Sequence, residues 1–203
     1  MCNELAENFI SLIDKFDNKN YLLSIIAYNA APAIAKFKPS YLIIFHNKGK
    51  RKLYDFWEEY KDIVKEELNI SFYELKSVDC STAVLFYNES QLFNILNQDN
   101  HIKFLERYGY KRNMSVKEGL ATLKERYKIT CPHEMGLFLG YPIEDVIEFI
   151  EHPNREALMF GYWKVYYNME SASNTFRKYD EIKMKVIDLI MNGVEPRIIM
   201  NNM

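Results

Sequence analysis

A chain of 203 residues is long enough to bury the core of one domain, or of one domain with a small appendage. Apolar residues make up 48% of it, which is ordinary for a globular protein, and the formal net charge is −2. A nearly neutral chain gives no general reason to attract nucleic acid, a membrane surface or a polyacidic molecule, so we expect neither nucleic acid nor a membrane as a partner.

The cysteine content and the N-terminal sequence favour the cytoplasm. Three cysteines are few and odd in number, which argues against a disulfide framework and fits a reducing compartment. The first residues, MCNELAENF, lack the basic region of a signal peptide. The longest apolar run, 21–35, is shorter than a membrane span and is interrupted by Pro32. We therefore predict a cytoplasmic protein.

Periodicity predicts two helices and a strand at the start of the chain. Apolar residues recur on one helical face over 4–16. Residues 21–35 are almost wholly apolar, which is typical of a buried helix that Pro32 either kinks or divides. The segment 41–45 (YLIIF) is short and rich in β-branched residues, and it predicts a buried strand.

The loop that follows this strand is strongly basic. Residues 46–52 read HNKGKRK, with four Lys or Arg residues. Such a loop fits either a phosphate site or a solvated strand-to-helix connection, and the neutral charge of the whole chain favours the connection.

The middle of the chain predicts a helix, a hairpin and three more helices. Apolar residues over 53–68 recur at intervals of three, four and seven, as in an amphipathic helix. Two strands over 69–78 and 82–87 are separated by a turn-like segment and form a predicted hairpin. The last of the three helices begins at Ser115, whose Ser-x-x-Glu spacing is that of a capping box.

The last third predicts a helix after Pro142, one strand and a long helix. Residues 157–167 (ALMFGYWKVYY) are mostly aromatic or aliphatic, which indicates a single strand. The last helix starts after Asn168, and the tail 194–203 is expected to fray. Together the elements predict an α+β fold, in which a single helix-rich domain (1–203) packs around one mixed or antiparallel sheet of about three to five strands.

A functional site is expected in the segment 130–163, which concentrates Cys, Pro, His, Glu and Gly in an otherwise apolar run. His133 and Glu134 resemble the start of a zinc-protease helix. That chemistry requires a second His four residues after the first, and position 137 is Leu. No second Cys/His pair stands at zinc-finger spacing either, so no metal site is predicted.

Two interpretations of these residues stay open. His133 can activate a thiol nucleophile, Cys131 or Cys80, if the side chains meet in space, and otherwise both are ordinary thiols. His133 and Glu134 also fit the start of a buried helix, where a carboxylate satisfies free N–H groups. The sequence does not identify a cofactor.

The candidate residues follow from the clustering of polar groups, Gly and Pro. The candidate catalytic residues are His133, Glu134, Cys131 and Cys80. The candidate ligand-binding residues are Tyr28, Asn29, Tyr141, Trp163 and Lys164.

Several segments resemble a known family. The runs PHEMGLFLGYPIEDVIEFI and GYWKVYYN, with the early YNAAPAIAKFKPSYL, are similar to the marked segments of the clostridial family known as domain of unknown function 3793. The resemblance covers nearly the whole chain and implies one domain in an intracellular protein of anaerobic Firmicutes. Asn29 and Ala33 stand where the family often has His and Thr, so chemistry that depends on those two residues is expected to be lost here. The resemblance supplies no catalytic residues.

Three functions are compatible with these observations. The favoured one is a cytoplasmic small-molecule or peptide-acting protein with its site around the CPHE-G-FLGYP stretch. The second is a non-catalytic ligand-binding or regulatory protein that uses the many tyrosines as an aromatic pocket. The third is an interaction protein in which the stretch is a packing motif.

Overall fold

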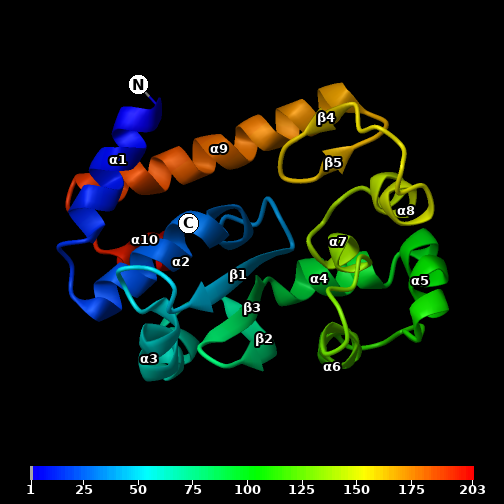
Figure 1. Cartoon of the computed structure of the whole chain (residues 1–203), viewed down its shortest axis with the longest axis horizontal. Helices are drawn as coiled ribbons and strands as arrows, with labels where there is room; N and C mark the ends of the chain where they lie inside the picture. Colours follow the sequence, from blue (N-terminus) through cyan, green and yellow to red (C-terminus); the bar gives the residue numbers. More distant parts are fainter. Residues whose placement is uncertain (1) are drawn as a thin grey trace.

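The computed structural model describes residues 2–203, and side chains from residue 5 onward. The described chain is mainly helical, with a three-stranded sheet and a separate two-stranded sheet, so the α+β prediction is confirmed (Figure 1). The helices are α1 (Cys2–Ile13), α2 (Asn18–Ile34), α3 (Leu53–Glu67), α4 (Glu89–Leu96), α5 (Asp99–Leu105), a 3₁₀ turn (Glu106–Tyr108), α6 (Val116–Tyr127), α7 (Met135–Phe138), α8 (Ile143–Glu151), α9 (Met169–Met191) and α10 (Pro196–Asn202). No helix within 2–203 has the length and apolar composition needed to cross a membrane.

The larger sheet is antiparallel with the order β1-β3-β2, in which β1 is Ser40–His46, β2 is Ser71–Val78 and β3 is Ser81–Tyr87. The predicted hairpin of β2 and β3 is confirmed, and Asp79 and Cys80 form its turn. The central strand β3 is buried along most of its length because both faces of the sheet are covered.

The two faces of the sheet contribute to two apolar clusters. Ile43, Val84 and Phe86 point into a cluster with α2, α3 and α9. Leu75 and Leu85 point into the other cluster, with α4 to α8. Successive strand residues alternate between faces, so the sheet separates the two clusters. In Figure 1 the helices α4 to α8 accordingly gather on one side of the sheet.

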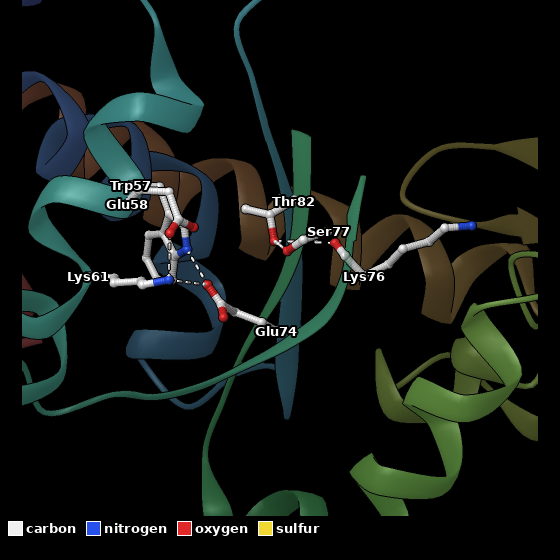
Figure 2. Close-up of polar contacts among 7 residues, drawn as sticks. All are labelled: Trp57, Glu58, Lys61, Glu74, Lys76, Ser77 and Thr82. Carbon is white, nitrogen blue, oxygen red and sulfur yellow. Dashed lines mark hydrogen bonds and ion pairs between the residues drawn. The ribbon is translucent and has the colours of Figure 1, made fainter. Parts of the chain in front are cut away.

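Polar contacts fix α3 on strand β2 (Figure 2). The indole N–H of the fully buried Trp57 donates to Glu74 Oε1 at 2.7 Å. Lys61 Nζ lies 3.3 Å from the same oxygen and 2.8 Å from Glu58 Oε2. The Trp57 indole, which would be costly to bury unpaired, is thereby satisfied.

The prediction of one strand over 157–167 is wrong. Two short antiparallel strands, β4 (Met159–Phe160) and β5 (Lys164–Val165), are joined by a turn that starts at Gly161. A Cβ atom at Gly161 would lie 2.1 Å from the ring of Phe176 on α9. The chain therefore turns tightly against α9 at this glycine, whereas the aromatic composition alone indicated an uninterrupted strand.

The prediction of a frayed tail is also wrong. Residues 196–202 form α10, with Pro196 in its first turn. Ile199 and Met200 are buried against the first cluster, and α10 contacts α2. Burial of this apolar face orders a segment that its length and position had marked as free to fray.

Pro32 and the basic loop 46–52 both have structural roles. Pro32 lies in the last turn of α2, which ends at Ile34, so it neither divides the segment nor opens a second helix. In the basic loop, Arg51 donates to the carbonyls of Asp14 and Phe16, and Lys52 donates to the carbonyl of Asn47. Arg51 thereby ties the loop to the segment that follows α1, and Lys52 ties the loop to itself, as expected for a connection.

Candidate functional site

A pocket of about 340 Å³ lies where α7, α8 and the β4–β5 turn meet. Its surface is mainly apolar, with a few polar groups. It is lined by Cys131, Pro132, His133, Met135, Gly136, Leu139, Tyr141, Asp145, Val146, Phe149, Trp163 and Lys164. Five of the predicted site residues are among these: Cys131, His133, Tyr141, Trp163 and Lys164.

Two glycines shape the wall of this pocket. A Cβ atom at Gly136 would lie 2.7 Å from Cγ2 of Val146, so the missing side chain lets α7 approach α8 closely. Gly140 has a φ of 73°, which ends α7 in a left-handed turn, and the N–H of Tyr141 then donates to the carbonyl of Gly136 at 2.9 Å. The turn places the ring of Tyr141 in the pocket.

Asp145 holds the opposite wall in place. Its Oδ2 accepts a hydrogen bond from the indole N–H of Trp163 at 2.8 Å, and its Oδ1 accepts one from the backbone N–H of Tyr166 at 2.8 Å. Trp163 in turn stacks on Tyr141, with 5.2 Å between ring centroids. Sequence reasoning missed this role, because the two donors lie 18 and 21 residues further along the chain.

The exposed part of the pocket carries two basic side chains, His133 and Lys164. The His133 ring meets Phe149 edge-on, with centroids 5.1 Å apart. Lys164 Nζ lies 5.2 Å from the centroid of the same Phe149 ring. Both His133 and Lys164 are solvent-exposed, so an imidazole and an amine flank one aromatic wall.

Glu134 lies outside the lining of this pocket, although it was a predicted catalytic residue. Its carboxylate forms an ion pair with Arg126 and accepts a hydrogen bond from the Tyr110 hydroxyl at 3.3 Å. Its side chain is 1% exposed. These contacts fit the structural interpretation, in which Glu134 anchors the start of α7 to α6.

The two cysteines with described side chains differ in position. Cys131 is exposed and lines the pocket, and burial together with the Cys131 thiol raises the pKa of Tyr127 to about 12. Among the described contacts, no hydrogen bond joins Cys131 to His133. Cys80 is exposed in the β2–β3 turn and is not part of the lining.

Tyr28 and Asn29, the last two predicted ligand-binding residues, lie on α2 and also outside the lining. Asn29 Nδ2 donates to the carbonyl of Ile25 within the same helix at 2.9 Å. The Tyr28 ring faces Lys183, with Nζ 5.3 Å from the centroid.

A second polar group that sequence reasoning missed is Lys38, just before β1. Its side chain is buried, and its Nζ lies 4.9 to 6.0 Å from four tyrosine ring centroids. We call these four rings the tyrosine cage: Tyr41, Tyr141, Tyr162 and Tyr179. Burial, reinforced by the nearby Lys183, lowers the pKa of Lys38 to about 7. In the sequence, the only indication of the tyrosine cage is the high tyrosine content.

The weak proton affinity of Lys38 predicts a pH-dependent stability. The unfolded chain binds this proton with a pKa of about 10.4, whereas the folded chain has a pKa of about 7. Between these values the unfolded state holds more protons, so the free energy of unfolding rises with pH, by at most about 1.4 kcal/mol per unit. We expect urea unfolding at pH 7, 8 and 9 to show this rise.

Lys38→Met is expected to reduce this slope, and Lys178→Met, on the exposed side of α9, to leave it unchanged. The pKa of Lys183 is also lowered by burial, so a smaller slope of the same sign is expected to remain in Lys38→Met. Equal slopes in the wild type and Lys38→Met would contradict the assignment of the titration to Lys38.

In the described part of the chain, no group of three or more His, Cys, Asp or Glu side chains is placed to hold a metal ion.

A comparison with family models gives one match, described as Protein of unknown function (DUF3793), over residues 26–200. No curated protein matches the chain, and no solved structure does.

Proposed function

The chain belongs to the DUF3793 family of proteins of unknown function, and we propose that it binds a small apolar molecule with an anionic group, without changing it chemically. The observation that carries the proposal is the pocket itself, an apolar hollow of about 340 Å³ with Lys164 and His133 on its exposed side. Ligand sites are typically concave, mostly apolar and provided with a few polar groups.

The size and lining of the pocket define the class of ligand. A volume of about 340 Å³ is at the small end of the range of roughly 300–1,000 Å³ for ligand sites. Tyr141, Phe149 and Trp163 offer aromatic surfaces, which stack well on a flat ring. The Lys164 amine favours an anionic substituent that points towards solvent.

Binding is favoured over catalysis because the pocket lacks an available carboxylate. Both oxygens of Asp145 already accept hydrogen bonds that hold the wall, and Glu134 is engaged with Arg126 outside the lining. Cys131 and His133 remain as reactive groups, but general-base activation requires a hydrogen bond that these two do not share in the described structure.

Paired ligands test the proposal. We expect indole-3-acetate to raise the melting temperature more than indole-3-acetamide, because only the acid carries the anionic group. Lys164→Met is expected to weaken binding of the acid about two- to fivefold, as a partly exposed ion pair contributes up to about 1 kcal/mol, and to leave the amide unaffected. Titration calorimetry measures both affinities.

Lys178→Met is the matched control. Lys178 is also exposed and lies over an aromatic ring, with Nζ 5.1 Å from the Phe37 centroid, but it lines no part of this pocket. An equal loss of affinity in both variants, or no stabilisation by either ligand, would refute the anionic ligand class. Mass spectrometry of the recovered ligand tests the absence of chemical change, and a modified product that Cys131→Ser abolishes would favour an enzyme.

A further inference from the structure

The amine of Lys38 lies behind rings that face two surface hollows. Tyr141, one member of the tyrosine cage, also lines the pocket of about 340 Å³. Tyr179, another member, lines an open hollow of about 540 Å³ together with Phe37, the residue before Lys38. Lys38 itself is 2% exposed and lines neither hollow, so the rings separate its amine from solvent.

This amine has aromatic neighbours and no carboxylate partner. No ion pair to Lys38 occurs among the side chains that the structure describes, from residue 5 onward. Instead a second amine, Lys183 Nζ, lies 5.2 Å from the centroid of Tyr41 and 4.8 Å from that of Tyr162, two rings that Lys38 also faces. Burial and a like charge both disfavour the protonated form, and with a pKa of about 7 about half of Lys38 is unprotonated at neutral pH.

A structural role alone explains this arrangement poorly. An apolar side chain of the same length would fill the space between the four rings without burying an amine. A lysine that is desolvated and placed beside another cation is, in contrast, an activated nucleophile for carbonyl groups.

We propose that Lys38 forms a covalent imine with a small carbonyl compound, an aldehyde or ketone, that reaches it from one of the two hollows. The proposal does not rest on the ligand class proposed for the 340 Å³ pocket. The reactive site lies in the tyrosine cage. Of the residues predicted from the sequence to form a site, only Tyr141 belongs to this cage.

The reaction balances without an oxidant or reductant. The lone pair of the unprotonated Nζ attacks the carbonyl carbon and forms the C–N bond, and the carbonyl oxygen becomes the hydroxyl of a carbinolamine. That hydroxyl then leaves as water with the remaining amine proton, which gives the C=N bond. Burial raises the pKa of both Tyr141 and Tyr179 to about 12, so these phenols stay protonated at neutral pH and place no negative charge beside the amine.

Reductive trapping on the wild-type protein tests the proposal. The folded protein is incubated at pH 7 with glyoxylate, a small aldehyde, and with cyanoborohydride, which reduces an imine to a stable amine. Peptide mapping by mass spectrometry locates the label. We expect Lys38 to react at least about tenfold faster than any exposed lysine, since its unprotonated fraction is roughly a thousandfold larger and burial offsets part of that advantage.

Two results would overturn the imine. One is labelling of exposed lysines such as Lys164 and Lys178 with Lys38 unmodified, and the other is labelling of Lys38 only after unfolding in urea. Lys183→Met gives a further test. If Lys38 had only a packing role, this variant would not change the pH dependence of Lys38 labelling. Removal of the like charge raises the pKa of Lys38, so its labelling is expected to slow at pH 7 and to recover at pH 9. A labelling rate in Lys183→Met that is the same as wild type at pH 7 would contradict the activation by Lys183.

Discussion

Replacing Glu134 by alanine is expected to lower the free energy of unfolding by on the order of 3 kcal/mol, because the change leaves the charge of Arg126 without its partner. The carboxylate is 1% exposed and also accepts the Tyr110 hydroxyl, which would lose its acceptor. The Arg126 side chain is 35% exposed, and this access to water keeps the loss at the lower end of the range for buried pairs. Urea denaturation measures the change.

Glu125→Ala provides the control for this prediction. Glu125 is on α6, next to Arg126, and pairs with Lys128 at 2.7 Å, but both side chains are more than half exposed. A surface pair of this kind contributes up to about 1 kcal/mol, so this variant is expected to lose little stability. Similar losses in the two variants would mean that the Glu134 pair does not anchor α7. If Glu134 acted as a catalytic residue instead, its removal would affect activity with little loss of stability.

Gly140→Ala is expected to destabilise the protein by about 2–4 kcal/mol, since it combines backbone strain with a steric clash. The φ of 73° is unfavourable for alanine. The added Cβ would lie 2.5 Å from Cδ and 2.7 Å from Cγ of Pro39, and the closed proline ring cannot rotate away. Thermal and urea unfolding are expected to agree on the loss.

Gly109→Ala separates the two causes. Gly109 also has a positive φ, 91°, but no heavy atom lies within 4 Å of the Cβ that it would gain. This variant is therefore expected to lose only about 1–2 kcal/mol from the backbone. Equal losses at the two glycines would show that contact with Pro39 contributes nothing. A larger loss at Gly140 would establish that this contact joins the two segments.

That contact lies between the pocket and the cage. Pro39 follows Lys38, and Gly140 precedes Tyr141, which belongs to both the pocket wall and the tyrosine cage. A buried hydrogen bond from Ser40 Oγ to the carbonyl of Phe138, at 2.7 Å, fixes the same junction. A small shift at Gly140 is therefore expected to change both ligand binding and the reactivity of Lys38.

Local sequence patterns were sufficient for most of the regular elements. The capping box at Ser115 has both of its hydrogen bonds, and the N-cap at Asn168 accepts from the N–H of Ser171. These features depend on residues three or four positions apart, so they can be recognised in the sequence alone. The hairpin of β2 and β3 is equally local, with its turn at Asp79 and Cys80.

Patterns failed where distant segments decide the conformation. The aromatic run at 157–167 turns at Gly161 because Phe176 on α9 occupies the space of a side chain there. The tail becomes α10 because Ile199 and Met200 are buried against the first cluster. Neither partner is visible from the local sequence, so composition alone gave the wrong structure.

The candidate site divides in the same way. The sequence by itself located the segment 130–163 and named Cys131, His133, Tyr141, Trp163 and Lys164, which the structure brings to one pocket. Only the tertiary structure decided that the Glu134 carboxylate pairs with Arg126 and that Lys38 is buried among four tyrosines, three of which come from distant parts of the chain. The physical reason is that residue type sets which chemistry is available, whereas burial and neighbouring charges, which depend on the whole fold, set the proton affinity and the partners of each group.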